Sequence, residues 1–179
     1  SKHVNHFTEK VNPDDSSEPL LVATDLPDEL RDALVKFGAT DIGNKVYQQF
    51  IKDGATATFT EVTTATDPDM QVAWRVGFNG NPNEIHYTRN ISAWKAAPYT
   101  KRPGDEVQSA TLGSLIAHEF GHTKSGLAAI GIRSNTYKRN IDEPRASALF
   151  ENAYRAKYNM PIKRTYAVEN DVLNFREKR

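Results

Sequence analysis

The sequence predicts an α+β fold that contains a small, mostly antiparallel sheet. Two helical patterns come first, a stretch rich in Thr, Val and Phe follows, and helical patterns return in the second half. Strands and helices do not alternate as in parallel βαβ units, and no internal repeat is evident. With 179 residues, the chain is expected to form a single domain, 1–179. Because it begins with Ser rather than Met, we interpret it as a trimmed chain or a domain excised from a longer protein.

Two helices are expected in the first third of the chain. The first begins at Pro27, which two acidic residues follow, and ends at Gly38. The second begins at Thr40, whose hydroxyl is suited to cap a helix, and extends through Ile51. Its apolar stripe consists of Ile42, Val46, Tyr47 and Phe50. We therefore expect this helix to pack on a hydrophobic core.

Strands are expected next, because polar and apolar residues alternate in Ala55–Thr64, Gln71–Phe78 and Glu84–Thr88. Turn residues at 79–83 separate the last two strands and predict a hairpin. His86 is interpreted as an exposed or cross-strand residue rather than a metal ligand. Either of the last two strands, as an edge strand, could hold an extended peptide by strand addition.

The stretch from residue 109 to 126 contains an HExxH motif, in which His118 and His122 are four residues apart. Apart from His118 and Glu119, residues 107–120 carry no charged or titratable side chain, which predicts a buried helix. On a helix, this spacing aims two imidazoles at one point and suits a tetrahedral Zn²⁺. Glu119 then faces a water at the metal without ligating it. The alternative is a pair of His side chains bonded within a polar core.

The chain has no cysteine, so His and carboxylate groups are the available metal ligands. Residues 127–140 are expected to be irregular, and a further helix is expected over Asp142–Tyr158. Glu143, at the start of that helix, lies 21 residues after His122. This order is that of the thermolysin-like zincins, which bind zinc through two His and one Glu. We therefore expect Zn²⁺ on His118, His122 and Glu143; the alternative for Glu143 is a charge that favours a helix N-terminus.

Other acidic residues follow the HExxH motif, namely Asp142, Glu151 and Glu169. Glu151 lies two turns after Glu143 and could point inward as the partner of a zinc-bound His. The third His that metzincins use is absent. The formal net charge is zero, and no apolar run is long enough to span a membrane. We therefore expect neither a nucleic-acid partner nor membrane insertion.

An ordered set of residues resembles the NleD-like bacterial effector metallopeptidases. It comprises the HExxH motif, Glu143 opening a helix, Glu151-Asn152-x-x-Arg155, and a basic stretch after Pro161 that ends at Tyr166. Similar domains are found at the C-terminus of some VgrG spike proteins of type VI secretion. The sequence departs from the expected pattern three positions before Tyr166, where it has Lys163 instead of Arg, with Arg164 beside it.

The resemblance implies a zinc endopeptidase that a specialised secretion system delivers into a target cell as a toxin or virulence factor. The rest of a spike protein is then an expected partner. In this interpretation Glu119 is the general base, an extended protein segment is the substrate, and Tyr166 donates a hydrogen bond to the oxyanion. The alternative for Tyr166 is an ordinary half-buried tyrosine. Two other functions stay open: a zinc amidohydrolase that acts on a cell-wall fragment, and a non-catalytic binding module stabilised by zinc.

Overall fold

The computed structural model describes residues 2–8, 20–21, 25–62, 75–76, 80–89 and 110–164, together with positions 172 and 175. These residues form an α+β structure, as the sequence predicted. Tyr166, Glu169 and most of the expected strand Gln71–Phe78 lie outside the described residues. No described helix is both long and apolar enough to cross a lipid bilayer.

The strands of the described residues form one sheet in the spatial order β2-β1-β3-β5-β4. Their bounds are Lys2–Thr8 for β1, Leu20–Leu21 for β2, Thr56–Glu61 for β3, Arg75–Val76 for β4 and Glu84–Tyr87 for β5. β1 is antiparallel to β2 and β3, and β4 is antiparallel to β5. The central pair, β3 and β5, is parallel, with Phe59 opposite Ile85. The expectation of a mostly antiparallel sheet is therefore wrong at the sheet centre.

The position of β5 explains this correction. The predicted hairpin is present, with Arg75 opposite His86, but it inserts β5 between β3 and β4. β5 is thus an inner strand, and the idea that Glu84–Thr88 is an edge strand is wrong. All four β5 residues are buried, as is usual for a strand covered on both faces. His86 is accordingly a buried cross-strand residue rather than an exposed one.

The two predicted helices of the first third are confirmed as α1, Asp28–Gly38, and α2, Asp41–Lys52. The hydroxyl oxygen of Thr40 accepts a hydrogen bond of 2.9 Å from the backbone N–H of Gly43, which caps α2 as expected. A Cβ atom on Gly43 would lie only 1.8 Å from the carbonyl oxygen of Phe37. The close corner between α1 and α2 therefore requires glycine at this position.

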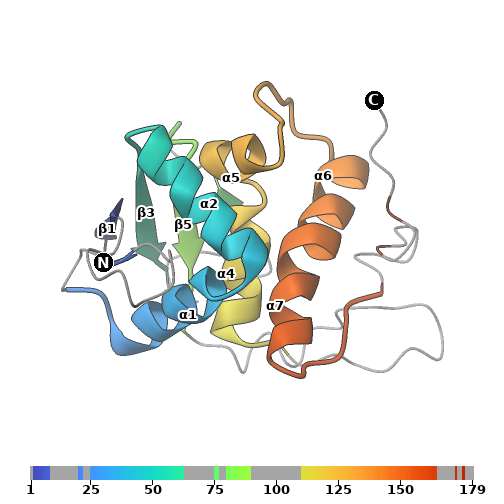
Figure 1. Cartoon of the computed structure of the whole chain (residues 1–179), viewed down its shortest axis with the longest axis horizontal. Coiled ribbons are helices and arrows are strands. Elements are labelled where there is room, and N and C mark those ends of the chain that lie inside the picture. Colours follow the sequence, from blue (N-terminus) through green and yellow to red (C-terminus); the bar gives the residue numbers. More distant parts are fainter. Residues whose placement is uncertain are drawn as a thin grey trace.

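The HExxH motif begins on α4, Leu112–Phe120, which is buried along nearly its whole length. Phe120, inside the motif, stacks on Phe37 with ring centroids 5.0 Å apart and an interplanar angle of 15°. Three further rings meet it edge-on, namely Tyr47, Phe50 and Phe59. Phe120 thus anchors α4 in the aromatic core, whereas His118 and His122 contact Glu143 on α6. Figure 1 shows α4 between the sheet and the long C-terminal helical segment.

Two helical features differ from the expectation for the second half. Residues Lys124–Ala129 form α5, capped by the Thr123 hydroxyl, so the expected irregular segment 127–140 begins as helix. The next helix begins at Arg139, three residues before the expected start, and comprises α6, Arg139–Ala146, the π-helical turn η2, Ser147–Glu151, and α7, Asn152–Lys157 (Figure 1). Pro144 consequently lies inside the helix rather than in its first turn.

Candidate metal centre

The end of α4 brings the two motif histidines together. His122 lies just beyond the last helical residue, but Gly121 keeps a helical conformation, with φ −67° and ψ −11°. The helical i,i+4 relation therefore extends to His122, and the two Nε2 atoms are 3.2 Å apart. Gly121 also permits close packing, because a Cβ atom there would lie 2.9 Å from the Cβ of Ala146 on α6. The same residue thus sets the His pair and the approach of the second helix.

Glu143 on α6 completes a compact set of donor atoms. Its Oε2 lies 3.1 Å from the Nε2 atoms of both His118 and His122. With the 3.2 Å between the two nitrogens, the three atoms form a nearly equilateral triangle. A tetrahedral ion bound at about 2.0–2.1 Å has ligand atoms separated by about 3.3 Å, so this spacing fits. The group His118, His122 and Glu143 could therefore hold a metal ion.

The protonation of His118 also fits a cation at this position. Its Nδ1 lies 3.0 Å from Glu151 Oε1 and 3.1 Å from the Oγ of Ser147. A carboxylate can only accept, so Nδ1 carries a proton and donates it to Glu151. The Nε2 lone pair then points towards Glu143, which is also an acceptor, and either a second proton or a cation must reconcile the two. Glu151 is thus the hydrogen-bond partner of His118, and its side chain points inward, as the sequence analysis considered.

The π-helical turn explains how one helix presents two carboxylates to one imidazole. In a regular α-helix, Glu143 and Glu151 would point about 80° apart around the axis. One extra residue in a π-turn reduces this separation to about 20°. Ser147–Glu151 form such a turn, and both carboxylates reach His118 from opposite ring nitrogens. The irregularity of the helix therefore builds the site.

Buried cations fix the Glu151 carboxylate. Arg155, one turn later, donates from Nε to Glu151 Oε2 at 2.8 Å, and the Lys163 ammonium lies 3.6 Å from Oε1. All three side chains are almost completely buried. Burial by itself would raise the pKa of Glu151, but the charge of Lys163 and the hydrogen bond from His118 hold it well below its usual range. Burial lowers the pKa of Lys163. Glu151 therefore stays ionised as the acceptor for His118.

Asn152 connects the segment after α7 to this charged cluster. Its side-chain NH₂ donates to the carbonyl oxygen of Lys163 at 2.9 Å, and its Oδ1 accepts from the Lys163 N–H at 2.8 Å. Arg155 Nη1 also donates to the carbonyl oxygen of Pro161 at 3.2 Å. Glu151-Asn152-x-x-Arg155 thus has a physical role: it holds residues 161–163 against the helix. Arg164 is exposed, whereas Lys163 is the basic residue inside the cluster.

The carboxylates around His118 dominate its electrostatics. Burial opposes charge on this ring, but hydrogen bonds and charges of Glu143 and Glu151 outweigh it and raise the pKa of His118 to about 10. Although burial acts in the opposite direction, hydrogen bonds from His118 and His122 hold the pKa of Glu143 well below its usual range. A strong field of negative charge therefore surrounds the donor triangle, as a cation site requires.

Glu119 differs from the other two buried glutamates. Its side chain is buried, and within the described part of the chain no hydrogen bond reaches its carboxylate. Burial raises the pKa of Glu119 well above its usual value, with His118 and Lys163 opposing this shift and Glu143 and Glu151 adding to it. A carboxylate with a raised pKa and no fixed partner can take up and release a proton.

Two tyrosines are relevant to a possible hydrogen-bond donor for an oxyanion, Tyr166 and Tyr137. Tyr166 lies outside the described residues. Tyr137, which the sequence analysis did not select, lies with its hydroxyl 3.5 Å from Glu143 Oε1 and its ring 6.0 Å from the His122 ring. The only sequence signal for it is an aromatic residue in a polar segment shortly before Glu143. Asp142, one of the acidic residues that follow the motif, hydrogen-bonds to this segment and is not part of the donor triangle.

A comparison of this chain with protein-family models, curated proteins and solved structures finds no match.

Proposed function

We propose that this chain is a zinc-dependent endopeptidase of the His₂Glu type. The observation that carries the proposal is the donor triangle of His118, His122 and Glu143, beside the buried Glu119 that has no hydrogen-bond partner in the described residues. Nitrogen and carboxylate donors near tetrahedral spacing favour Zn²⁺. A structural zinc site has four protein ligands, whereas the group found in the described residues has three, which favours an open position.

The chemistry divides between the ion and Glu119. When bound, Zn²⁺ supplies a Lewis acid that lowers the pKa of a water towards ~7 and polarises the scissile carbonyl. Glu119 accepts a proton from the attacking water as the water oxygen bonds to the carbonyl carbon. It then delivers this proton to the amide nitrogen as the C–N bond breaks, which leaves a carboxylic acid and an amine. The raised pKa of Glu119 supports this exchange.

The surrounding residues keep the ligands in place for this reaction. Glu151 fixes the orientation of the His118 ring, and Arg155 and Lys163 fix Glu151. For the substrate we propose a protein segment in extended form, because β4 lies at the end of the strand order and β5 does not. The ordered motif set from His118 to Arg155 supports a secreted effector or toxin that acts inside a target cell.

The proposal is tested by Glu119→Gln together with metal analysis. We expect the wild type to carry about one equivalent of zinc and the variant to keep it, because Glu119 lies outside the donor group. Hydrolysis should fall by about 10²–10⁴-fold, the usual contribution of a general base. New protein N-termini would be identified in lysates treated with the wild type and with the variant.

Each alternative gives a different result in the same experiment. A zinc amidohydrolase would bind zinc and yield no new protein N-termini, while releasing amines from cell-wall fragments. A non-catalytic module would bind zinc and hydrolyse neither. Zinc below about 0.2 equivalents, without recovery on addition of the ion, would contradict the metal site itself.

A further inference from the structure

Tyr137 lies on the solvent side of the donor triangle. Its side chain is 57% exposed, although its hydroxyl lies 3.5 Å from Glu143 Oε1 and its ring 6.0 Å from the His122 ring. Glu143 Oε2 lies 3.1 Å from both histidine Nε2 atoms, and Oε1 lies 2.9 Å from the Nε2 of His122 alone. The Tyr137 hydroxyl thus contacts a carboxylate of the donor group, which consists of His118, His122 and Glu143, without being a member of that group.

The other side of the triangle is closed. Glu151 and Ser147 occupy the Nδ1 side of His118, and Lys163 lies behind Glu151. All of these side chains are buried, whereas His122 and Tyr137 are not completely covered. Among the described residues, Tyr137 therefore marks the least covered side of the donor triangle.

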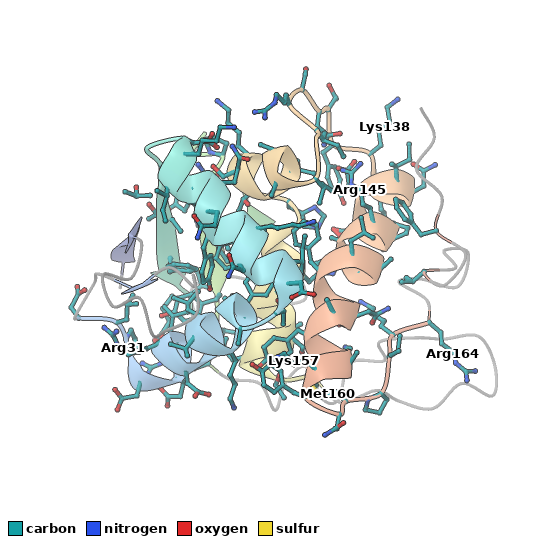
Figure 2. The ribbon with its side chains drawn as sticks, in the orientation of Figure 1. Arg31, Lys138, Arg145, Lys157, Met160 and Arg164 are labelled. Carbon is teal, nitrogen blue, oxygen red and sulfur yellow. The ribbon has the colours of Figure 1, made fainter. Side chains whose placement is uncertain are left out.

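The segment that carries Tyr137 is held in place by Asp142. The carboxylate of Asp142 accepts from Asn135 Nδ2 at 2.7 Å and from the backbone N–H of Lys138 at 2.8 Å. It also forms an ion pair with Arg145 at 2.5 Å, and both side chains are buried. Lys138 directly precedes α6 and Arg145 lies in its last turn, and Figure 2 labels both in the upper part of the α6–η2–α7 segment. The segment around Tyr137 is thus attached on both sides to the helix that supplies Glu143.

We propose that Tyr137 donates its hydroxyl hydrogen bond to the substrate carbonyl oxygen as that oxygen gains negative charge. In the resting site the same hydroxyl lies at Glu143 Oε1, and the substrate oxygen replaces this acceptor. Asp142 acts as a positioning residue, because it holds the segment and does not reach the triangle. The inference rests on the proposed function and assigns to Tyr137 the role that sequence analysis expected of Tyr166.

The test uses the binding of acetohydroxamate to cobalt-substituted protein, followed by the visible absorption of Co²⁺. Metal-bound acetohydroxamate carries a negatively charged oxygen. Loss of one hydrogen bond to this oxygen should therefore weaken acetohydroxamate binding about 10- to 100-fold in Tyr137→Phe. Metal affinity, measured by competition with a chelator, should stay within about twofold of the wild type, because the triangle is intact. Where hydrolysis is measurable, kcat should fall and KM should change little.

Three further variants complete the design. Asn135→Ala should weaken acetohydroxamate binding less than Tyr137→Phe does, because it loosens the segment but keeps the hydroxyl. Tyr158→Phe is the matched control, since the Tyr158 hydroxyl donates to the carbonyl oxygen of Lys36. Tyr166→Phe is measured in parallel.

Wild-type binding in Tyr137→Phe would overturn the inference, as would a loss of metal affinity in place of probe affinity. The acetohydroxamate binding measurement requires an open metal site but no peptidase activity. A failure of the proposed function is therefore seen separately, as zinc-loaded wild type that binds acetohydroxamate and cleaves no protein.

Discussion

The two helical segments that meet at the donor triangle are held by different forces. α4 is fixed by aromatic packing, since Phe120 contacts four other rings of the core. The segment α6–η2–α7 is fixed by buried charge, with Glu151 bound to His118, Arg155 and Lys163. Packing depends on shape, and buried charge depends on protonation and on complete pairing. The stability of the protein and the metal affinity of the site should therefore respond to different substitutions.

The largest effect should come from the packed segment. Phe120→Ala removes the ring at the centre of the aromatic cluster and should lower the free energy of unfolding by about 3–5 kcal/mol. Zinc affinity of the molecules that remain folded should change little, because Phe120 touches no donor atom. Chemical denaturation of metal-free protein and chelator competition measure the two quantities. A large loss of zinc affinity at unchanged stability would show that Phe120 supports the metal site rather than the stability of the core.

The charged segment should show the opposite pattern. Glu143→Ala removes a donor atom and should weaken zinc binding most strongly. Glu151→Ala should weaken it by about 10–100-fold, as is usual when the partner of a ligand histidine is lost. The same chelator competition ranks the two variants, with Lys157→Met on the exposed side of α7 as a control. If Glu151→Ala were the weaker binder of the two, Glu151 would be the third ligand.

The two segments also differ in how far the sequence could predict them. The motif helix was predictable because the His118–His122 spacing and the charge-free run before it are local properties of the chain. Glu143 followed from its distance to the motif, but the inward direction of Glu151 depends on the π-turn at Ser147–Glu151. No spacing rule indicates that turn, which adds one residue to a helix that otherwise has a regular pattern.

Long-range contacts account for the remaining differences. The burial of Lys163 depends on the side chain of Asn152, eleven residues earlier, binding its backbone. The central position of β5 depends on its parallel pairing with β3, and a strand with polar Glu84 and His86 gives no sign of being covered on both faces. Tyr137 lies beside the site in a segment that Asp142 holds through Asn135 and Lys138. Each of these features joins residues that local patterns treat separately.

The smallest expected effect is the change in the free energy of unfolding per pH unit. This pH dependence is specific to the charged segment. The raised pKa of His118, about 10, means that this group stabilises metal-free protein fully below pH ~6.5. This contribution is lost as pH rises through 10, by up to about 1.4 kcal/mol per pH unit. The lowered pKa values of Glu143 and Glu151 stabilise the protein above pH ~4.5, and that contribution is lost as pH falls. The raised pKa of Glu119 adds a contribution that is lost as pH rises above ~4.5. Metal-free protein should therefore be most stable near pH ~5.

Bound zinc should reverse the loss of stability that is expected as pH rises. A ligand histidine must give up the proton on Nε2, so zinc binding at neutral pH displaces a proton from His118. Zinc affinity should consequently rise about tenfold per pH unit up to pH ~10, rather than level off near the ordinary pKa of histidine. Thermal unfolding with and without zinc between pH 5 and 10, with Glu151→Gln as the comparison, measures both trends. A zinc affinity that does not change above pH 7.5 would show that the carboxylates do not hold a proton on His118. The charged segment would then not differ from the packed one in its dependence on protonation.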